Sequence, residues 1–145
     1  MGTWDIAPFD NDTAADFAGG LDDAPEGERE ALIRSALARA AGTDDYLEAD
    51  VADEAIAAAA LVAAQRPGGT PVTTAYGPQR PIPPLPAELA GLAVQALDRV
   101  VSDPSELLEL WGETDHAGPW RSTVDRLRQT LLREPPGGRP IPTAT

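Results

Sequence analysis

Apolar residues recur at intervals of three and four along most of the chain, the spacing that places side chains on one face of an α-helix. The clearest example is the segment from 86 onward, where leucine, alanine and valine form an unbroken stripe as far as Val101. Strand-like alternation is confined to a short stretch at 71–76. The pattern therefore predicts an all-α protein with helices over about 13–18, 25–41, 50–65, 86–101, 104–111 and from 119 to about 131.

Residue types that begin and end helices mark the expected boundaries. Asp23 and Asp103 are expected to cap the second and fifth helices, because each has a glutamate three residues later. Asp50 is the expected cap of the third helix. Gly19 and Gly20 are expected to end the first helix, since two glycines favour a left-handed cap over another turn. In the fifth helix, the spacing directs Leu107, Leu110 and Trp111 inward.

The segment 50–65 is apolar nearly all round, which is typical of a buried helix. Its inward positions are mostly alanine, and small side chains let neighbouring helices approach closely. We therefore expect one compact bundle of about six helices over residues 1–133, with this helix at its centre. The expected inward set is Ala52, Ala55, Ile56, Ala59, Val62 and Ala63.

The segment 67–86 contains seven prolines and three glycines, which neither a helix nor a central strand tolerates. It is interpreted as a long proline-rich connector, either a strap laid across the bundle or a loose linker. A polyproline II segment at 81–86, of the kind that aromatic grooves bind, is the weaker alternative. Residues 134–145 are expected to form a flexible tail.

Charge is distributed unevenly along this acidic chain. The formal net charge is −13, with 24 Asp and Glu against 11 basic residues, all of them arginine. Residues 1–54 hold fifteen of the acidic residues and three arginines, so nearly all of the net negative charge falls in the first part of the chain. An acidic domain repels phosphate backbones, which argues against nucleic-acid binding. It attracts basic protein surfaces or cations.

The sequence lacks several features of secreted and membrane proteins, which bears on where in the cell the protein is expected. The chain has no cysteine, and its first twenty residues have neither a basic residue nor a continuous apolar run, so no secretory signal is expected. The longest apolar run, 55–64, is about half of what a membrane span needs. The sequence therefore predicts a bacterial cytoplasmic protein that neither spans nor binds a membrane.

The N-terminal segment combines scarce aromatic residues with aspartates. Trp4, Phe9 and Phe17 are three of only seven aromatic residues, so the segment is expected to pack against the bundle. Oxygen ligands for a hard cation are available there, although the spacing does not match an EF-hand loop. The alternative assigns the aspartates to caps, turns and partner-facing charge. The metal candidates are Asp10, Asp12 and Asp16, with Asp5 nearby, and the partner-facing set adds Asp22 and Asp23.

Catalytic signals are weak. His116 is the only histidine and precedes a helix, where a general-base role is less favoured than an ordinary exposed side chain. No phosphate-binding glycine loop, nucleophile elbow or histidine pair occurs. Trp4, Trp111 and Trp120 are candidates for a ligand pocket, but helical spacing favours core positions for two of them. No cofactor is expected, and the inventory favours a protein without enzymatic activity.

Four short motifs carry a family resemblance: Met1-Gly-Thr-Trp, Pro8-Phe-Asp-Asn-Asp, Ala14-Ala-Asp-Phe and Leu21-Asp-Asp. Together they resemble the opening of a bacterial family of domains of unknown function, numbered 4259. The resemblance continues through Tyr46-Leu-Glu and Ser105-Glu-Leu-Leu-Glu-Leu-Trp, and covers roughly residues 1–132. Many members have glycine where this chain has Asp5 and Ala7. The resemblance implies a shared fold but no activity.

These observations favour a non-enzymatic interaction protein, of the immunity or inhibitor kind, whose acidic first part docks a basic protein partner. The alternative is a carboxylate-based divalent-metal-binding protein or metal-dependent enzyme that uses the N-terminal aspartates.

Overall fold

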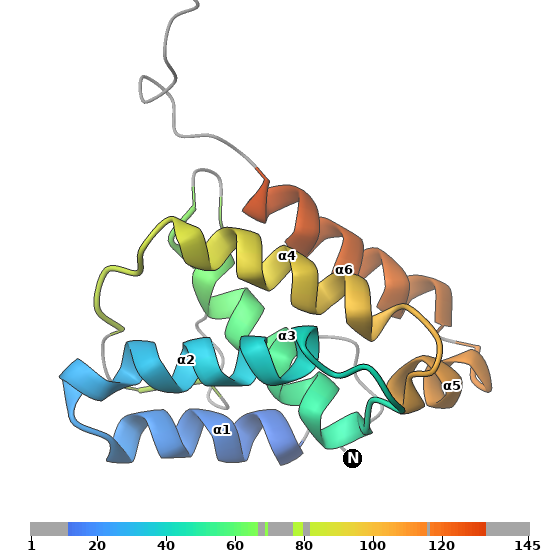
Figure 1. The fold of residues 1–145 in the computed structure, drawn as a ribbon, viewed down its shortest axis with the longest axis horizontal. Coiled ribbons are helices and arrows are strands. Elements are labelled where there is room, and N and C mark those ends of the chain that lie inside the picture. Colours follow the sequence, from blue (N-terminus) through green and yellow to red (C-terminus); the bar gives the residue numbers. More distant parts are fainter. Residues whose placement is uncertain (1–11, 67–68, 70–76, 80–81, 116, 133–145) are drawn as a thin grey trace, which may run out of the picture.

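The computed structural model describes residues 12–66, 69, 77–79, 82–115 and 117–132, and Figure 1 shows their arrangement. Within these ranges the chain forms six helices and no strand, so the all-α prediction is confirmed. Leu47 and Ser105 form an isolated parallel β-bridge. The helices are α1 (Asp12–Asp23), α2 (Glu26–Ala41), α3 (Ala49–Ala64), α4 (Glu88–Val100), α5 (Glu106–Gly112) and α6 (Ala117–Leu131).

The alanine-rich helix α3 lies at the centre of the bundle, as its sequence predicts. It packs against each of the other five helices. In Figure 1, α1 and α2 run in opposite directions, α4 and α6 lie above them, and α5 lies at one end of the bundle; α4 packs against both α2 and α3. Every residue of α3 from Ala55 to Ala63 is buried, because alanine leaves room for neighbours on all sides. Ala52 is buried as well, so the entire expected inward set of the helix is buried.

The first helix is longer than predicted. Gly19 and Gly20 do not end α1, which continues to Asp23. Its inner face, formed by Ala14, Ala18 and Leu21, is fully or almost fully buried. Two glycines inside a helix cost about 2 kcal/mol, whereas burial of a leucine contributes roughly 1.5–3 kcal/mol and burial of Ala14 and Ala18 adds to it. Tertiary packing therefore outweighs the local preference of the glycine pair.

The buried Arg29 side chain supports the end of α1. Its Nε donates to the Leu21 carbonyl oxygen at 2.9 Å, and a terminal nitrogen donates to the Ala24 carbonyl oxygen at 3.0 Å. Asp23, expected to cap α2, is instead the last residue of α1, and Pro25 occupies the N-cap position of α2 without a side-chain hydrogen bond. That cap prediction is wrong because α1 continues into the predicted cap.

The fifth helix also begins later than predicted. Ser105 is its N-cap, and its hydroxyl accepts a hydrogen bond from the Leu108 N–H at 3.3 Å, so Asp103 is not the cap. Ser105 is held in an extended conformation by its bridge to Leu47, which places the helix start two residues further on. Leu110, predicted to point inward, is 48% exposed.

Part of the connector lies against the bundle. The Gln65 side chain donates to the Pro83 carbonyl oxygen at 3.0 Å and accepts from the Leu85 N–H at 2.8 Å. At Gly69, an added Cβ would lie 1.9 Å from the Ala63 carbonyl oxygen, so the close approach of the chain to the end of α3 requires glycine. The expected tail 134–145, the possible strand at 71–76 and most of 67–76 lie outside the described residues.

None of the helices in the described ranges has the length and apolar character needed to cross a bilayer.

Candidate functional site

The predicted N-terminal aspartates separate into three groups. Asp5 and Asp10 lie outside the described residues. Asp12, Asp16 and Asp23 are exposed and, at spacings of four and seven, lie on one outward face of α1. We call these three residues the α1 acidic face. Asp22 points elsewhere.

Asp22 binds the connector through both carboxylate oxygens. Its Oδ1 and Oδ2 accept from the Gln79 N–H at 2.9 and 3.0 Å. This carboxylate therefore has a structural contact within the chain and does not belong to the α1 acidic face.

The arginines of the first part of the chain are engaged inside the molecule. Arg29 is buried against carbonyl oxygens. Arg34 bridges Glu30 and Glu88, at 2.7 Å from each. Arg39 lies 2.8 Å from Glu54. None of them forms an ion pair with the α1 acidic face, whose carboxylates have no ion pair with any described residue.

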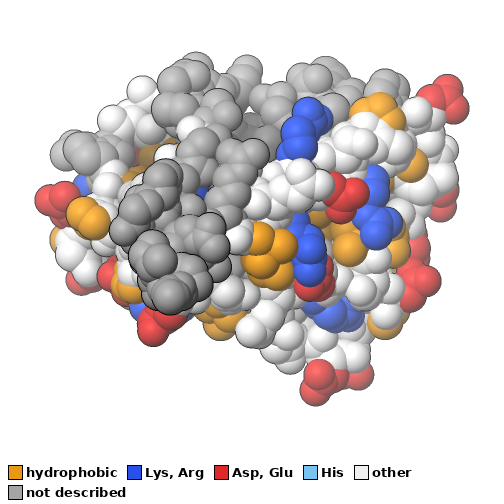
Figure 2. Space-filling view, turned by 90° about the horizontal axis from the view of Figure 1, so that it is seen from above, with side chains coloured by type: hydrophobic (Ala, Val, Ile, Leu, Met, Phe, Trp, Pro, Cys, Tyr) orange, Lys and Arg blue, Asp and Glu red, His pale blue; other side chains and the backbone are white. Residues whose placement is uncertain are grey.

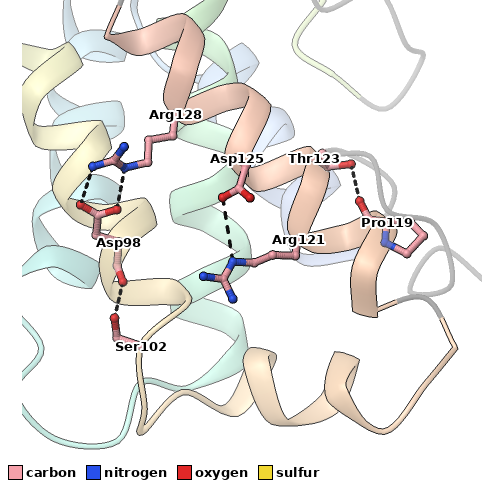
Figure 3. A network of polar contacts seen from close by, with 7 residues as sticks. All are labelled: Asp98, Ser102, Pro119, Arg121, Thr123, Asp125 and Arg128. Atoms are coloured by element: carbon pink, nitrogen blue, oxygen red, sulfur yellow. Dashed lines mark hydrogen bonds and ion pairs between the residues drawn. The ribbon is translucent and has the colours of Figure 1, made fainter.

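Two arginines of α6 also form ion pairs with carboxylates of the chain. Arg128 Nε lies 2.8 Å from Asp98 Oδ1 on α4, and Arg121 Nε lies 3.9 Å from Asp125 Oδ1, as Figure 3 shows. Figure 2 shows arginine side chains gathered on the upper face of the molecule, with most of the carboxylates towards its edges. Positive charge is thus present on that face, and two of the α6 arginines form ion pairs with carboxylates.

The described residues give no support to a metal centre. Among them, no group of three or more His, Asp or Glu side chains is placed to hold a metal ion. Asp12 and Asp16 are exposed on the surface of α1, and their proposed third ligand, Asp10, lies outside the described residues. His116 also lies outside them, so its general-base hypothesis is not addressed.

Two of the three tryptophans belong to the core. The rings of Trp111 and Trp120 stack with centroids 6.0 Å apart and planes 9° apart, and both residues are buried. The stack joins α5 to α6. The core interpretation of these two residues is confirmed, whereas Trp4 lies outside the described part of the chain.

A second acidic region, which the sequence reasoning missed, forms where α5 meets the start of α3. The Leu47–Ser105 bridge brings the two segments together, through Leu47 N–H to the Pro104 carbonyl oxygen at 3.1 Å and Glu106 N–H to the Leu47 carbonyl oxygen at 2.8 Å. Neither 43–54 nor 103–115 contains a basic residue. We call the region formed by these two segments the α3–α5 acidic end.

Glu106 caps α3 rather than its own helix. Its Oε1 accepts a hydrogen bond from the N–H of Ala49, the first residue of α3, at 2.8 Å. A carboxylate at this position is favoured because the N-terminus of a helix carries partial positive charge. Asp50, expected to cap α3, lies within the helix, and the N-cap residue Glu48 makes no side-chain cap hydrogen bond. The predicted pairing of Glu106 with a cap on α5 is therefore replaced by a contact between helices.

Asp53 has the most strongly altered acidity in the described chain. Loss of solvent around its half-buried carboxyl group, together with the negative charges of Asp50 and Glu106, raises the pKa of that group from 3.8 to about 7. Around neutral pH, this carboxyl group therefore carries a proton for part of the time.

Tyr46 contributes an aromatic side chain to the α3–α5 acidic end. Its hydroxyl donates to Glu109 Oε1 at 3.1 Å, and the ring is 46% exposed. Loss of solvent raises the pKa of the phenol, and the hydrogen bond to Glu109 and the charges of Glu109, Glu106 and Glu48 add to that increase. One sequence signal for this region was available: five carboxylates without a basic residue between 103 and 115. The total charge of residues 55–145 conceals this signal, because arginines elsewhere in that part of the chain offset the five carboxylates.

Comparison with known proteins gives a family but no characterised relative. The model of a family described as "Domain of unknown function (DUF4259)" matches residues 2–123. This match agrees with the resemblance carried by the N-terminal motifs. Neither the curated proteins nor the solved structures include a match to the chain.

Proposed function

The chain belongs to the DUF4259 family of domains of unknown function, and from this premise we propose that it is a non-enzymatic interaction protein that docks a basic protein partner. The proposal places it in the bacterial cytoplasm, acting as an immunity or inhibitor protein would, by covering a basic surface of another protein. The α1 acidic face, Asp12, Asp16 and Asp23, is the proposed contact surface.

One observation carries the proposal. The fold engages all three arginines of residues 1–54 elsewhere and leaves the α1 acidic face exposed, without an ion pair to any described residue. Like charges at a spacing of four on a helix cost a few tenths of a kcal/mol when nothing cationic lies between them. A basic partner would remove this repulsion when it binds.

The arrangement suits rapid association more than chemistry. The three carboxylates extend along about 16 Å of helix, given a rise of 1.5 Å per residue. Charges spread in this way attract an oppositely charged surface over a distance and orient it before contact. Such attraction weakens as salt shortens the Debye length from about 10 Å at 0.1 M to about 3 Å at 1 M.

The test removes the three charges without changing side-chain size. Asp12→Asn, Asp16→Asn and Asp23→Asn are combined in one variant, and basic proteins captured by the wild type from a lysate of the native bacterium are purified and titrated against both. The control variant, Glu26→Gln with Glu28→Gln and Asp125→Asn, removes the same charge from exposed positions outside both acidic regions. We expect slower association for the first variant, a smaller effect for the control, and a difference that disappears at high salt.

Two results would contradict the proposal. Equal losses in the two variants would show that only diffuse charge is involved. A melting temperature raised by one divalent ion, and not by matched sodium chloride, would favour the metal-binding alternative if Asp12→Asn and Asp16→Asn abolished the shift.

A further inference from the structure

The outward face of α5 presents apolar surface that no described part of the chain covers. Leu110 is 48% exposed, and Tyr46, whose hydroxyl is bonded to Glu109 on the same helix, is 46% exposed. The spacing of Glu106, Glu109, Leu110 and Glu113 places them on one face of α5, opposite the buried Leu107 and Trp111.

This apolar surface lies within a frame of carboxylates. Glu106 of α5 and Glu113, the C-cap residue of this helix, lie four and three residues from Leu110, the spacings of neighbours on one helix face, and Glu109 directly precedes Leu110 in the chain. Glu48 acts on Tyr46 from the start of α3, and the charges that raise the pKa of Tyr46 are all negative. An exposed leucine within such a frame is unsuited to bind a second copy of the same face, because like charges would then oppose each other.

Arg99 holds the two loops beside this face through backbone oxygens. Arg99 of α4 donates to the carbonyl oxygens of Thr43, Ser102 and Pro104 at 2.8–2.9 Å, and also to that of Asp45. It thereby fastens together the two loops that carry the α3–α5 acidic end. These hydrogen-bond acceptors are all backbone oxygens, and neither Arg99 nor the glutamates around Leu110 form an ion pair with any described residue.

We propose that the α5 face formed by Tyr46, Glu106, Glu109, Leu110 and Glu113 binds a partner segment that presents one apolar side chain flanked by arginine or lysine. The apolar side chain packs on Leu110 and the Tyr46 ring, and the flanking cations meet the surrounding glutamates. Charge complementarity selects this occupant, since every ionisable side chain in the frame is acidic. The inference shares with the proposed function only the basic character of the partner, and it assigns a different surface from α1.

The test uses a pair of short basic helical peptides of equal charge. One carries a central leucine with arginines one turn before and after it, and the other has serine in place of that leucine. Each is titrated against the wild type, Leu110→Ser and Leu32→Ser. Leu32 is the matched control because it is an exposed leucine, 39% accessible, on the distant surface of α2.

We expect the leucine peptide to bind the wild type about tenfold more tightly than the serine peptide, which corresponds to burial of one half-exposed leucine surface. Leu110→Ser should remove that difference, and Leu32→Ser should leave it unchanged. Backbone amide resonances perturbed by the leucine peptide should cluster in α5 and around Tyr46. Thermal unfolding of Leu110→Ser should match that of the wild type, because the side chain is outside the core.

Each contrary result has a distinct meaning. Equal affinity of the wild type for both peptides, or no binding of the leucine peptide, would overturn the α5 proposal. Salt-sensitive binding that is lost in the Asp12, Asp16 and Asp23 variant but not in Leu110→Ser would also overturn it, while leaving the proposed function intact. A Leu110-dependent difference that survives the α1 substitutions would support the α5 face even if α1 binds nothing.

Discussion

Glu106 of α5 accepts a hydrogen bond from the backbone N–H of Ala49 at 2.8 Å, so that a side chain 57 residues away caps the central helix. The contact satisfies a donor that no intrahelical acceptor can reach and places a negative charge at the positive end of the helix. It also brings Glu106 close enough to Asp53 to influence the acidity of that carboxyl group.

Replacing Glu106 by alanine should destabilise the fold by about 1 kcal/mol, the usual cost of losing a cap. The same change should lower the pKa of Asp53, because one of the negative charges that raise it is removed. Chemical denaturation and carboxyl-carbon NMR titration measure the two effects. Glu113→Ala, an exposed site at the end of α5, is the control; an equal loss of stability there would refute the cap.

The raised pKa of Asp53 predicts a specific dependence of stability on pH. The folded protein holds a proton up to about pH 7, whereas the unfolded chain releases it near pH 4. The protonated Asp53 carboxyl group therefore makes its full contribution to the free energy of unfolding below about pH 4. This contribution, roughly 1–4 kcal/mol, is lost as pH rises through about 7. Asp53→Asn should flatten this component and stabilise the protein at pH 8. Unfolding curves from pH 4 to 8 provide the test, and parallel profiles for the two proteins would contradict it.

Arg29 should matter more to stability than any other arginine of α2. Truncation to alanine leaves the Leu21 and Ala24 carbonyl oxygens without these donors at the end of α1, so we expect a loss of roughly 1.5–3 kcal/mol. Arg39→Ala removes an exposed ion pair with Glu54 and should cost at most about 1 kcal/mol. Urea denaturation of the two variants compares them directly. Equal losses would show that the buried contacts of Arg29 add nothing.

Two glycines should respond to alanine in opposite directions. Gly20 is an exposed position inside α1 with open space around its Cβ site, so Gly20→Ala should stabilise the protein by up to about 1 kcal/mol. Gly69→Ala should destabilise it, because the new methyl group would meet the Ala63 carbonyl oxygen at 1.9 Å. Melting temperatures report both. Destabilisation by Gly20→Ala would instead indicate that α1 ends at the glycine pair.

Local spacing was sufficient to predict the helices. The apolar residues of α2, α3 and α4 recur at intervals of three and four in the sequence, and the alanines of α3 predicted its central position. The negative net charge and the family motifs were likewise identified from the sequence alone. These features depend on neighbours in sequence, on composition, or on short motifs, so no knowledge of the packing was needed.

Tertiary structure alone decided which distant residues meet. Leu110 has the spacing of an inward residue, yet α5 is too short and too peripheral for both edges of its stripe to be covered, and the side chain faces outward. Glu106 matched a cap for its own helix, but the Leu47–Ser105 bridge carries it to the start of α3. The same bridge joins two acidic segments that are 49 residues apart from Glu54 to Asp103, because burial of apolar faces, and not charge, sets the positions of the helices.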